Sequence, residues 1–463
     1  MRILIVTLFF PPARNAGTEN YSLGLATALQ ARGHDVQVVC AEDWEDGDAY
    51  WNGVTQDRLQ GVTVNRVHLN WARAQNPNRV LYTSPQVDRW FADFLAATKP
   101  DLVHVTSTAT LGVGVLHAVR QAGIPLVLTL MDFWFLCPRT VLMTGEGHTC
   151  SGVTTPWECQ QCLLAGSGAY GRLHHLLPHR LEARFWHAAG HTPQFNRVRG
   201  LRGMALDMDE RKALLTQALA APDVILSHSA FVARMFAQAG CPYPVTHLPN
   251  GHDLGWLADH AGKTPSDVLR VGYMGQIHPI KGVHVLIDAF RQAEFGDAAR
   301  LRIWGNLDHM PGYARTLRAQ IGDDPTITLA GRFDRAELGR VLADIDVLVV
   351  PSVWYENAPL VIQEAFATGT PVITTDFGGM REAVTDHLDG LLFPRGDVAA
   401  LAARLRRLVD EPELLPRLRA GIRPVRTIDA EVDELETLYA RLVSHTPAPG
   451  DARPATVALG NPA

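Results

Sequence analysis

Two glutamates, Glu356 and Glu364, follow an apolar run at Val347–Val350 and are the clearest candidates for site chemistry. The run is typical of a buried strand, and Pro359 stands where the first residue of a following helix tolerates proline. The free amides at the start of that helix would form an anion site suited to a diphosphate. Glu364 would lie roughly 7–8 Å along the helix axis, at 1.5 Å per residue, where its carboxylate can accept hydrogen bonds from a ribose diol. Glu356, on the loop, can face a sugar. Either glutamate alone would more often be a solvated residue, but the two together favour a binding site.

Four cysteines form a second group with the spacing C-x12-C-x8-C-x2-C. They are Cys137, Cys150, Cys159 and Cys162. Four thiols within 26 residues, ending in a CxxC pair, suit a tetrahedral structural zinc. Bound metal would also keep an irregular segment with few apolar residues ordered. Unligated thiols, or disulfides in an oxidised protein, are the alternatives.

The elements that must position these residues alternate along the chain as short apolar strands and helical stretches. In the first half the predicted strands are Arg2–Leu8, Val36–Cys40, Leu102–Val105, Leu126–Leu130, Val224–Ser227 and Val245–Leu248. Continuous apolar strands alternating with helices indicate a parallel sheet covered on both faces, which is a doubly wound α/β domain. We therefore predict a Rossmann-like domain over residues 1–248, interrupted by a Cys- and His-rich insertion at 137–215.

A second α/β series occupies the C-terminal half. Residues 249–267 are rich in Gly, His, Asp and Pro and are predicted to be a linker. A second doubly wound domain is expected over 268–425, a terminal helix over 426–444 and a disordered tail over 445–463. Two such domains would leave a cleft between them, and sheets of this kind bind ligands at the carboxyl ends of their strands.

Composition and charge narrow the class of protein. A chain of 463 residues is long enough for two domains. Its net charge of −6 gives no general affinity for nucleic acid or anionic membrane. No apolar run reaches the ~18 residues that span a bilayer. The apolar start, Met1–Phe10, is interpreted as a first buried strand and not as a signal peptide, which together with few cysteines favours a cytoplasmic enzyme.

The region around the two glutamates resembles the retaining glycosyltransferases of family 4, which have the GT-B fold. The family signature is two glutamates separated by seven residues, as in Glu356 and Glu364. Pro351-Ser352 precedes this pair. The similarity continues after it through Gly369–Ile373, Gly378-Gly379, Glu382, Gly390 and Leu392. The stretch Phe133–Arg139 is similar to the subset of the family that has a four-cysteine insertion.

This resemblance implies roles for residues in both domains. It implies catalytic roles for Glu356, Asp132 and Lys281. The implied donor-binding residues are Gly17, Gly275, Gln276, Lys281, Asn357, Ala358, Pro359, Leu360 and Glu364, and those on the acceptor side are Thr18 and Glu19. His104, at the end of a neighbouring strand, is either a further acceptor-side residue or a satisfied core histidine.

Three positions depart from the family pattern. Gln276 replaces the usual arginine of the phosphate loop, Met131 replaces the usual histidine before Asp132, and Ala16 replaces the first glycine of the N-terminal loop. A protein that binds sugar nucleotides with impaired catalysis, using the cysteines for partner contacts, is therefore the alternative to an active enzyme. An epimerase or phosphorylase on the same fold is disfavoured by the setting of the two glutamates.

The implied reaction is transfer of a sugar from a UDP- or GDP-sugar to a hydroxyl acceptor, with retention at the anomeric carbon. The acceptor could be a glycan, a lipid-linked glycan or a small metabolite, and peripheral contact with the inner face of the membrane is compatible with this interpretation. No catalytic metal is implied, because the lysine and helix amides would neutralise the diphosphate. Zinc would be structural only.

Overall fold

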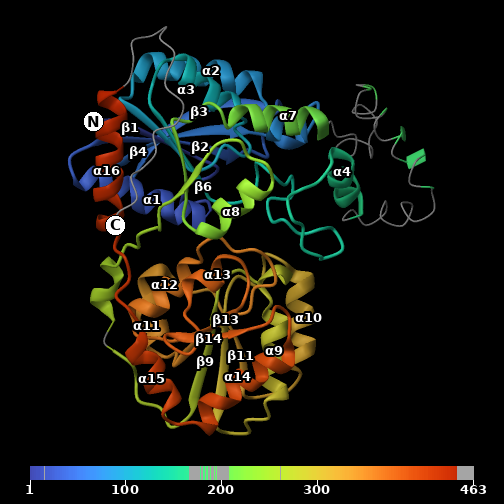
Figure 1. The fold of residues 1–463 in the computed structure, drawn as a ribbon, viewed down its shortest axis with the longest axis vertical. Coiled ribbons are helices and arrows are strands. Elements are labelled where there is room, and N and C mark those ends of the chain that lie inside the picture. The colour runs from blue at the N-terminus through green and yellow to red at the C-terminus, as the bar shows by residue number, and fades with distance from the viewer. Residues whose placement is uncertain are drawn as a thin grey trace. The chain divides into compact units, whose positions relative to one another are not determined.

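The computed structural model describes residues 1–14, 16–165, 208–260 and 262–445, together with residues 178, 181, 182, 184, 185, 188, 192 and 194. It divides into two compact units. Unit 1 combines residues 1–249 with the C-terminal segment from Asp429 onward, and unit 2 is Asn250–Ile428. Each unit has its own sheet (Figure 1).

Unit 1 is built on an eight-stranded sheet with the order β3-β4-β2-β1-β5-β6-β7-β8. Its strands are β1 (Arg2–Thr7), β2 (Asp35–Asp43), β3 (Trp51–Leu59), β4 (Val62–Leu69), β5 (Leu102–Val105), β6 (Leu126–Leu130), β7 (Val224–Ser227) and β8 (Val245–His247). All neighbours pair in parallel except β3 and β4, which form an antiparallel hairpin. The order reverses between β1 and β5, so the carboxyl ends of these two strands mark the switch point of the sheet.

Helices cover both faces of this sheet. They are α1 (Gly17–Ala31), α2 (Pro85–Thr98), α3 (Gly114–Gln121), α4 (Pro156–Ala165), α7 (Met208–Ala218), α8 (Ala230–Gln238) and α16 (Ile428–Ser444), with short 3-10 helices η1 (Trp71–Arg73) and η2 (Arg79–Leu81). Helices α2, α3 and α7 share one side and α1 lies on the other (Figure 1). Helix α2 starts where its sequence predicts a start, because Ser84 caps the amide of Val87 and Pro85 occupies the first turn.

The last helix returns to unit 1, although the chain between Asn250 and Ile428 belongs to unit 2. Glu431 of α16 accepts a hydrogen bond of 2.7 Å from the hydroxyl of Tyr21. Arg32 forms ion pairs with Asp433 and Glu436 of the same helix. These contacts tie α16 to α1.

Unit 2 has a six-stranded, fully parallel sheet with the order β11-β10-β9-β12-β13-β14. Its strands are β9 (Leu269–Met274), β10 (Ala299–Trp304), β11 (Ile327–Gly331), β12 (Val347–Val350), β13 (Val372–Thr375) and β14 (Gly390–Phe393). Its helices are η4 (Gly255–Asp259), η5 (Pro279–Lys281), α9 (Val283–Gln292), α10 (Pro311–Ile321), η6 (Arg335–Glu337), α11 (Leu338–Ala343), α12 (Leu360–Ala367), α13 (Gly378–Ala383), α14 (Val398–Asp410) and α15 (Leu414–Gly421). Its switch point lies between β9 and β12.

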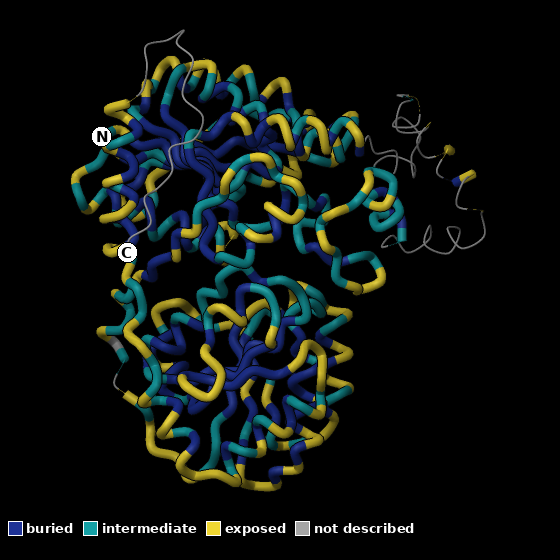
Figure 2. Tube along the Cα trace, viewed as in Figure 1, coloured by how far each residue is buried: buried dark blue, intermediate teal, exposed yellow. Residues whose placement is uncertain are grey.

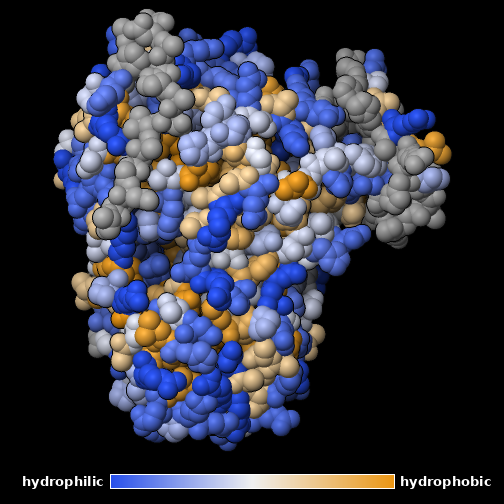
Figure 3. Space-filling view, in the orientation of Figure 1, coloured by the Kyte–Doolittle hydropathy of each residue, from blue (hydrophilic) through white to orange (hydrophobic). Residues whose placement is uncertain are grey.

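The two faces of the unit 2 sheet each carry a hydrophobic core. One cluster joins the sheet to α9, α10, α14 and α15, and the other joins it to α11, α12 and α13. In both units the strands are the most buried part of the trace (Figure 2). On the surface seen in Figure 3, hydrophilic and hydrophobic residues are interspersed over each unit.

The predicted fold class, two doubly wound α/β domains, is confirmed, but the expectation of parallel pairing throughout is wrong for β3. The sequence reading missed both strands of the β3–β4 hairpin. The hairpin turns through Gln60 and Gly61, both with positive φ. No residue of β3 is buried, so this strand lacks the apolar run by which the other strands were found.

The predicted linker and insertion take a different form from the sequence reading. Residues 250–260 and 262–267 form part of unit 2, where Lys263 donates hydrogen bonds of 2.6 Å to the carbonyls of Leu342 and Ile345. The insertion at 137–215 is described up to Ala165 and again from Met208. Its middle, and the tail from 446 to 463, lie outside the described residues apart from the eight single positions given above.

Candidate functional site

The loops that follow β9 and β12 pack together at the switch point of the unit 2 sheet. The amide of Val353 donates to the carbonyl of Ile280 across 2.8 Å. Gly282 has a φ of +72°, and a Cβ at this position would come within 2.0 Å of the carbonyl oxygen of Pro351. Only glycine therefore allows the β9 loop to approach the β12 loop this closely. The contact brings Lys281, on the first loop, to Glu356, on the second.

Glu356 gathers three donors on one carboxylate oxygen. Its Oε1 accepts from Lys281 Nζ at 2.7 Å, from Ser352 Oγ at 2.7 Å and from Trp354 Nε1 at 2.8 Å. The lysine nitrogen also lies 5.0 Å from the centre of the Trp354 ring, a cation–π contact. Glu356 is buried, whereas 22% of the Lys281 side chain is exposed. The lysine is thus held at the sheet edge with part of its side chain exposed.

The backbone of Glu356 is fixed by the glycine pair that follows β13. The amide of Gly379 donates to the carbonyl of Glu356 across 2.9 Å. A Cβ on Gly379 would meet the carbonyl oxygen of Asn357 at 1.5 Å. The pair therefore packs directly against the backbone of the loop that carries Glu356.

Glu364, on α12, is held by two cationic or ionisable partners. Arg335 Nη1 lies 2.7 Å and His252 Nε2 3.6 Å from the same oxygen, Oε1. Burial acts to raise the pKa of Glu364, but His252 and Arg335 outweigh it and the pKa lies below its ordinary value. The carboxylate is thus ionised at neutral pH. Both of these contacts are made by Oε1, and within the described ranges no hydrogen bond to Oε2 is seen, so this oxygen can accept from a ligand.

The start of α12 differs by one residue from the sequence prediction. Pro359 is not the first helical residue: it precedes the helix in extended conformation, with φ −64° and ψ 113°, and α12 begins at Leu360. Asn357 and Ala358 lie in the loop before it, half-buried. On the neighbouring loop Gly275 and Gln276 are exposed. The predicted donor residues of unit 2 therefore lie on two adjacent loops and the first turns of one helix.

In unit 1 the predicted loop Gly17-Thr18-Glu19 forms the first turn of α1. Glu19 is buried, and its carboxylate accepts from the backbone amide of Ala16 at 3.2 Å. Burial raises the pKa of Glu19. A Cβ on Gly17 would meet no atom within 4 Å, so the backbone there borders open space. Glu19 acts first as a cap of this helix.

Asp132 follows β6, near the switch point of the unit 1 sheet. One of its oxygens accepts from the amide of Trp134 at 2.7 Å. Burial raises the pKa of Asp132 to about 6, against the opposing effects of that amide and of Arg211. A small cavity at the carboxyl ends of β5 and β6 is lined by Thr106–Thr108, Leu128–Asp132, Trp134 and Phe135. The carboxyl group of Asp132 is thus among the groups that line this cavity.

His104 occupies the core and not the acceptor side. Its side chain is fully buried in β5. Nδ1 lies 2.5 Å from the hydroxyl of Tyr439 and Nε2 2.7 Å from that of Thr129. Burial lowers the pKa of His104 to about 3, so the ring is neutral. With both ring nitrogens satisfied inside unit 1, the core interpretation is the one that the structure supports.

Comparison with known proteins assigns this chain to a family. The model "Glycosyl transferases group 1" matches residues 268–411, and "Glycosyl transferase 4-like domain" matches residues 16–147. The glycogen synthase of Mycobacterium tuberculosis (strain H37Rv) is 31% identical over 461 residues, covering 96% of this chain and 94% of the relative. The chain belongs to the family 4 glycosyltransferases. It is therefore a transferase of the GT-B fold, and the comparisons give no support to the alternatives of an epimerase or a phosphorylase.

Other relatives of this glycosyltransferase match over a shorter span. The putative colanic acid biosynthesis glycosyltransferase WcaL of Escherichia coli (strain K12) is 32% identical over 203 residues, which are 42% of this chain and 50% of the relative. Among solved structures, sucrose-phosphate synthase from Thermosynechococcus elongatus has a TM-score of 0.65 at 18% identity, covering 96% of this chain and 100% of that one. Anabaena Alr3699/HepE, in complex with UDP and glucose, has a TM-score of 0.61 at 18% identity, covering 95% and 99%. These structures share the fold.

The four cysteines of the insertion lie in the described part of this glycosyltransferase. All four thiols are free. Burial raises the pKa of Cys137, Cys159 and Cys162. Within the ranges that the structure describes, no group of three or more His, Cys, Asp or Glu side chains lies close enough together to bind a metal ion.

Sequence reasoning missed three residues that contact the candidate donor carboxylates. Trp354 contacts Glu356, while Arg335 and His252 contact Glu364. Trp354 stands two residues before Glu356 and could have been noticed. Arg335 and His252 come from distant loops, and nothing in their local sequence marks them.

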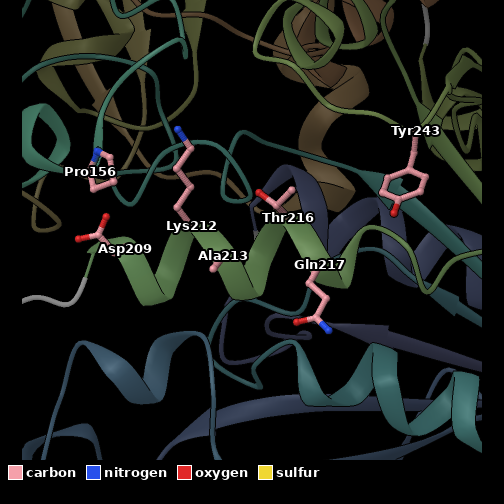
Figure 4. Close-up of a pocket in the computed structure, with 7 residues that line it drawn as sticks. All are labelled: Pro156, Asp209, Lys212, Ala213, Thr216, Gln217 and Tyr243. Carbon is pink, nitrogen blue, oxygen red and sulfur yellow. The ribbon is translucent and has the colours of Figure 1, made fainter.

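One further groove lies on unit 1, away from the candidate residues. It is lined by residues of α7, with Pro156 and Tyr243 from neighbouring segments; the α7 residues are Asp209, Lys212, Ala213, Thr216 and Gln217 (Figure 4). None of these residues carries a predicted role. Among the described helices, none combines the length and apolar character that crossing a membrane requires.

Proposed function

We propose that this glycosyltransferase moves a sugar from a nucleoside-diphosphate sugar to a hydroxyl group of a glycan or glycolipid acceptor, with retention of configuration at the anomeric carbon. The observation that carries the proposal is the pairing of Lys281 with Glu356 at the switch point of unit 2, together with an ionised Glu364 on α12 whose two basic partners both contact Oε1. Parallel sheets of this order bind nucleotides at that place.

The diphosphate would bind beside Lys281. The lysine side chain is partly exposed and already positioned, and the amides of Ala358 and Leu360 stand at the start of α12, where the helix dipole favours negative charge. Gln276 and Gly275, exposed on the β9 loop, would add neutral donors. Because one lysine and these amides can neutralise the leaving diphosphate, the proposed reaction needs no catalytic metal.

The nucleoside and the sugar would be held by the two glutamates. Oε2 of Glu364 would accept from the ribose diol, in a carboxylate kept ionised by Arg335 and His252. Glu356 would accept from a hydroxyl of the transferred sugar while staying within reach of Lys281. The two carboxylates thus bind different parts of the donor.

The chemical step would occur on one face of the sugar ring. The bond from the anomeric carbon to the diphosphate oxygen breaks, and a bond from the same carbon to the acceptor oxygen forms on the same face. The acceptor's proton passes to the leaving phosphate oxygen. The protein mainly positions the reactants and stabilises the charge that develops on the diphosphate. On unit 1, Gly17, Thr18, Glu19 and Asp132 are the proposed residues near the acceptor.

Names of relatives support a carbohydrate acceptor. WcaL is named for colanic acid biosynthesis and the mycobacterial relative is named glycogen synthase. Solved structures with the same fold include complexes with UDP-glucose and with ADP and acarbose. A polysaccharide or glycolipid is therefore the acceptor that we propose.

Thermal-shift binding tests the donor site. UDP, GDP, ADP and their common sugars are added to wild type, Lys281→Ala and Glu364→Ala, with Lys99→Ala and Glu411→Ala as controls exposed outside the site. We expect stabilisation by one nucleotide, weakened in the two site variants and unchanged in the controls. A well-folded sample that no nucleotide stabilises would refute the donor site. Turnover that persists in Glu356→Gln would refute the proposed role of that residue.

A further inference from the structure

The segment after β6 arranges the four cysteines around a small hairpin. Met143 and Thr149 pair as an antiparallel bridge, and the amide of Cys150 donates to the carbonyl of Leu142 at 2.8 Å. Cys137 lies on the turn before this hairpin. The CxxC pair, Cys159 and Cys162, lies on α4, and Cys162 Sγ approaches the carbonyl of Met143 at 3.9 Å. The hairpin and α4 therefore place all four thiols in one small region.

Donor groups surround the sulfurs. The amide of Gly152 donates to Cys150 Sγ at 3.4 Å, and Thr154 Oγ1 lies 3.1 Å from Cys159 Sγ. Backbone amides of Arg139 and Leu142 contact the thiol of Cys137, and that of Gly145 contacts Cys162. A protonated thiol needs few such donors, whereas a thiolate is stabilised by them. Burial still raises the pKa of Cys137, Cys159 and Cys162, so these donors would stabilise thiolates once a metal ion displaces the protons.

A buried cation, Arg211, contacts the loop that leads to Cys137. Arg211 of α7 is 7% exposed, donates to the carbonyl of Trp134, and lies 5.7 Å from the Trp134 ring. In the part of the chain that the structure describes, it has no ion pair with a carboxylate. Burial lowers the pKa of Arg211, and electrostatic interactions with Cys137, Cys159, Tyr82 and Asp132 oppose this effect. Asp132 is thus one acidic neighbour of this buried guanidinium, and thiolates at Cys137 and Cys159 would add further negative charge beside it.

We propose that Cys137, Cys150, Cys159 and Cys162 bind one zinc ion as thiolates, and that this anionic centre holds Arg211 against the loop that carries Asp132. Each thiol releases its proton to solvent when it binds the metal. The four side chains are not drawn together in this structure, so binding turns them toward one centre at about 2.3 Å from the metal. A tetrathiolate zinc centre carries excess negative charge, which Arg211 offsets.

Metal binding at the cysteines would affect Asp132 through one short loop, residues 132–137. The amide of Cys137 donates to the carbonyl of Phe133 at 2.7 Å, and Arg211 holds the carbonyl of Trp134. The amide of Trp134 in turn donates to Asp132. Metal at Cys137 would therefore make the 132–137 turn rigid from both sides. The metal site is independent of the proposed transferase role, whereas the positioning of Asp132 rests on it.

Metal content of the full chain tests the site. The protein is purified under reducing conditions without chelator, and zinc is measured by mass spectrometry for wild type, Cys150→Ser, Cys159→Ser and the control Cys241→Ser, whose cysteine lies outside the group. We expect about one zinc per chain in wild type and control, and a loss of at least fivefold in the other two. Cobalt added to the metal-free wild type should give the intense absorption of sulfur-to-cobalt charge transfer.

Three results would overturn the metal site. The first is a wild-type protein that stays zinc-free after reconstitution yet still binds its nucleotide. The second is a protein that contains iron and inorganic sulfide in place of zinc. The third is alkylation mapping that finds disulfides among the four cysteines. Hydrogen exchange tests the positioning role separately. Removal of zinc should speed exchange in residues 132–137 by tenfold or more without changing nucleotide affinity in unit 2. Unchanged exchange there would refute the link to Asp132.

Discussion

Replacing Glu356 with glutamine should separate binding of the leaving group from transfer of the sugar. In the structure the Lys281 ammonium donates to Glu356 Oε1 at 2.7 Å. A diphosphate that binds at Lys281 must compete with this carboxylate for the same cation. Glu356→Gln keeps an acceptor at the position but removes its charge. We therefore expect nucleoside diphosphate to bind more tightly in the variant while turnover collapses.

The magnitude follows from the bond that is weakened. A hydrogen bond between charged groups contributes about 1.5–3 kcal/mol and a neutral one about 0.5–1.5 kcal/mol. Because 22% of the Lys281 side chain is exposed, the lower ends of these ranges apply, and their difference is about 1 kcal/mol. That corresponds to roughly fivefold tighter binding. Lys281→Ala, which removes the cation, should weaken binding about tenfold or more.

Calorimetric titration of the four members of a double-mutant cycle measures this. Nucleoside diphosphate without sugar is titrated into wild type, Glu356→Gln, Lys281→Ala and the double variant, with Glu411→Gln as a control for loss of an exposed carboxylate. The double variant should bind within about twofold of Lys281→Ala, since without the lysine there is no cation left to release. If Glu356→Gln instead weakens binding as much as Lys281→Ala, then Glu356 holds Lys281 in place and competition is the wrong description.

Three further predictions concern other contacts of the site. Gly379→Ala should displace the Asn357 carbonyl oxygen, which would lie 1.5 Å from the new Cβ, and should lower turnover at least tenfold. At Gly17 a new Cβ would meet no atom within 4 Å, so Gly17→Ala should leave the melting temperature within about 1 °C of wild type. Asp132→Asn should stabilise the protein by about 1–2 kcal/mol above pH 6 and by little near pH 4. The reason is that the pKa of Asp132 in the folded state is raised from 3.8 to about 6, so ionisation of this carboxyl costs stability as pH rises through this range. Chemical denaturation at several pH values measures the difference, and equal stabilisation at pH 4 and above pH 6 would contradict the prediction. Arg335→Ala should reduce the preference for UDP over its 2′-deoxy analogue about threefold or more, since Arg335 positions the carboxylate proposed to bind the diol; an unchanged ratio would remove Glu364 from the ribose site.

The fold could be predicted from the sequence wherever burial leaves a continuous apolar run. Strand β6, Leu126–Leu130, agrees with its predicted bounds to the residue, and β12 does so as well. The β3–β4 hairpin was missed because one of its strands faces solvent on an edge of the sheet. Its two-residue turn at Gln60-Gly61, where both residues have positive φ, was the available signal.

The start of α12 shows a limit of local rules. Proline is favoured in the first turn of a helix, and Pro359 was assigned there on that ground. In the structure its ψ of 113° is extended, and it stands one residue before the helix. Proline fixes only φ, so the neighbouring loop decides ψ. The rule located the helix but not its first residue.

What could be predicted at the site depends on how far along the chain each side chain finds its partners. Glu356 is contacted by Ser352 and Trp354 from its own loop, and the switch-point rule supplies the loop that carries Lys281. A short motif therefore contains most of what this carboxylate needs. His104 is the opposite case, because one of its partners, Tyr439, lies 335 residues away on a helix that leaves unit 1 and returns. Before that return is known, a histidine at the end of a central strand is as consistent with a site as with the core. Residues whose environment comes from local segments can thus be assigned from sequence, whereas those completed by a distant helix require the fold.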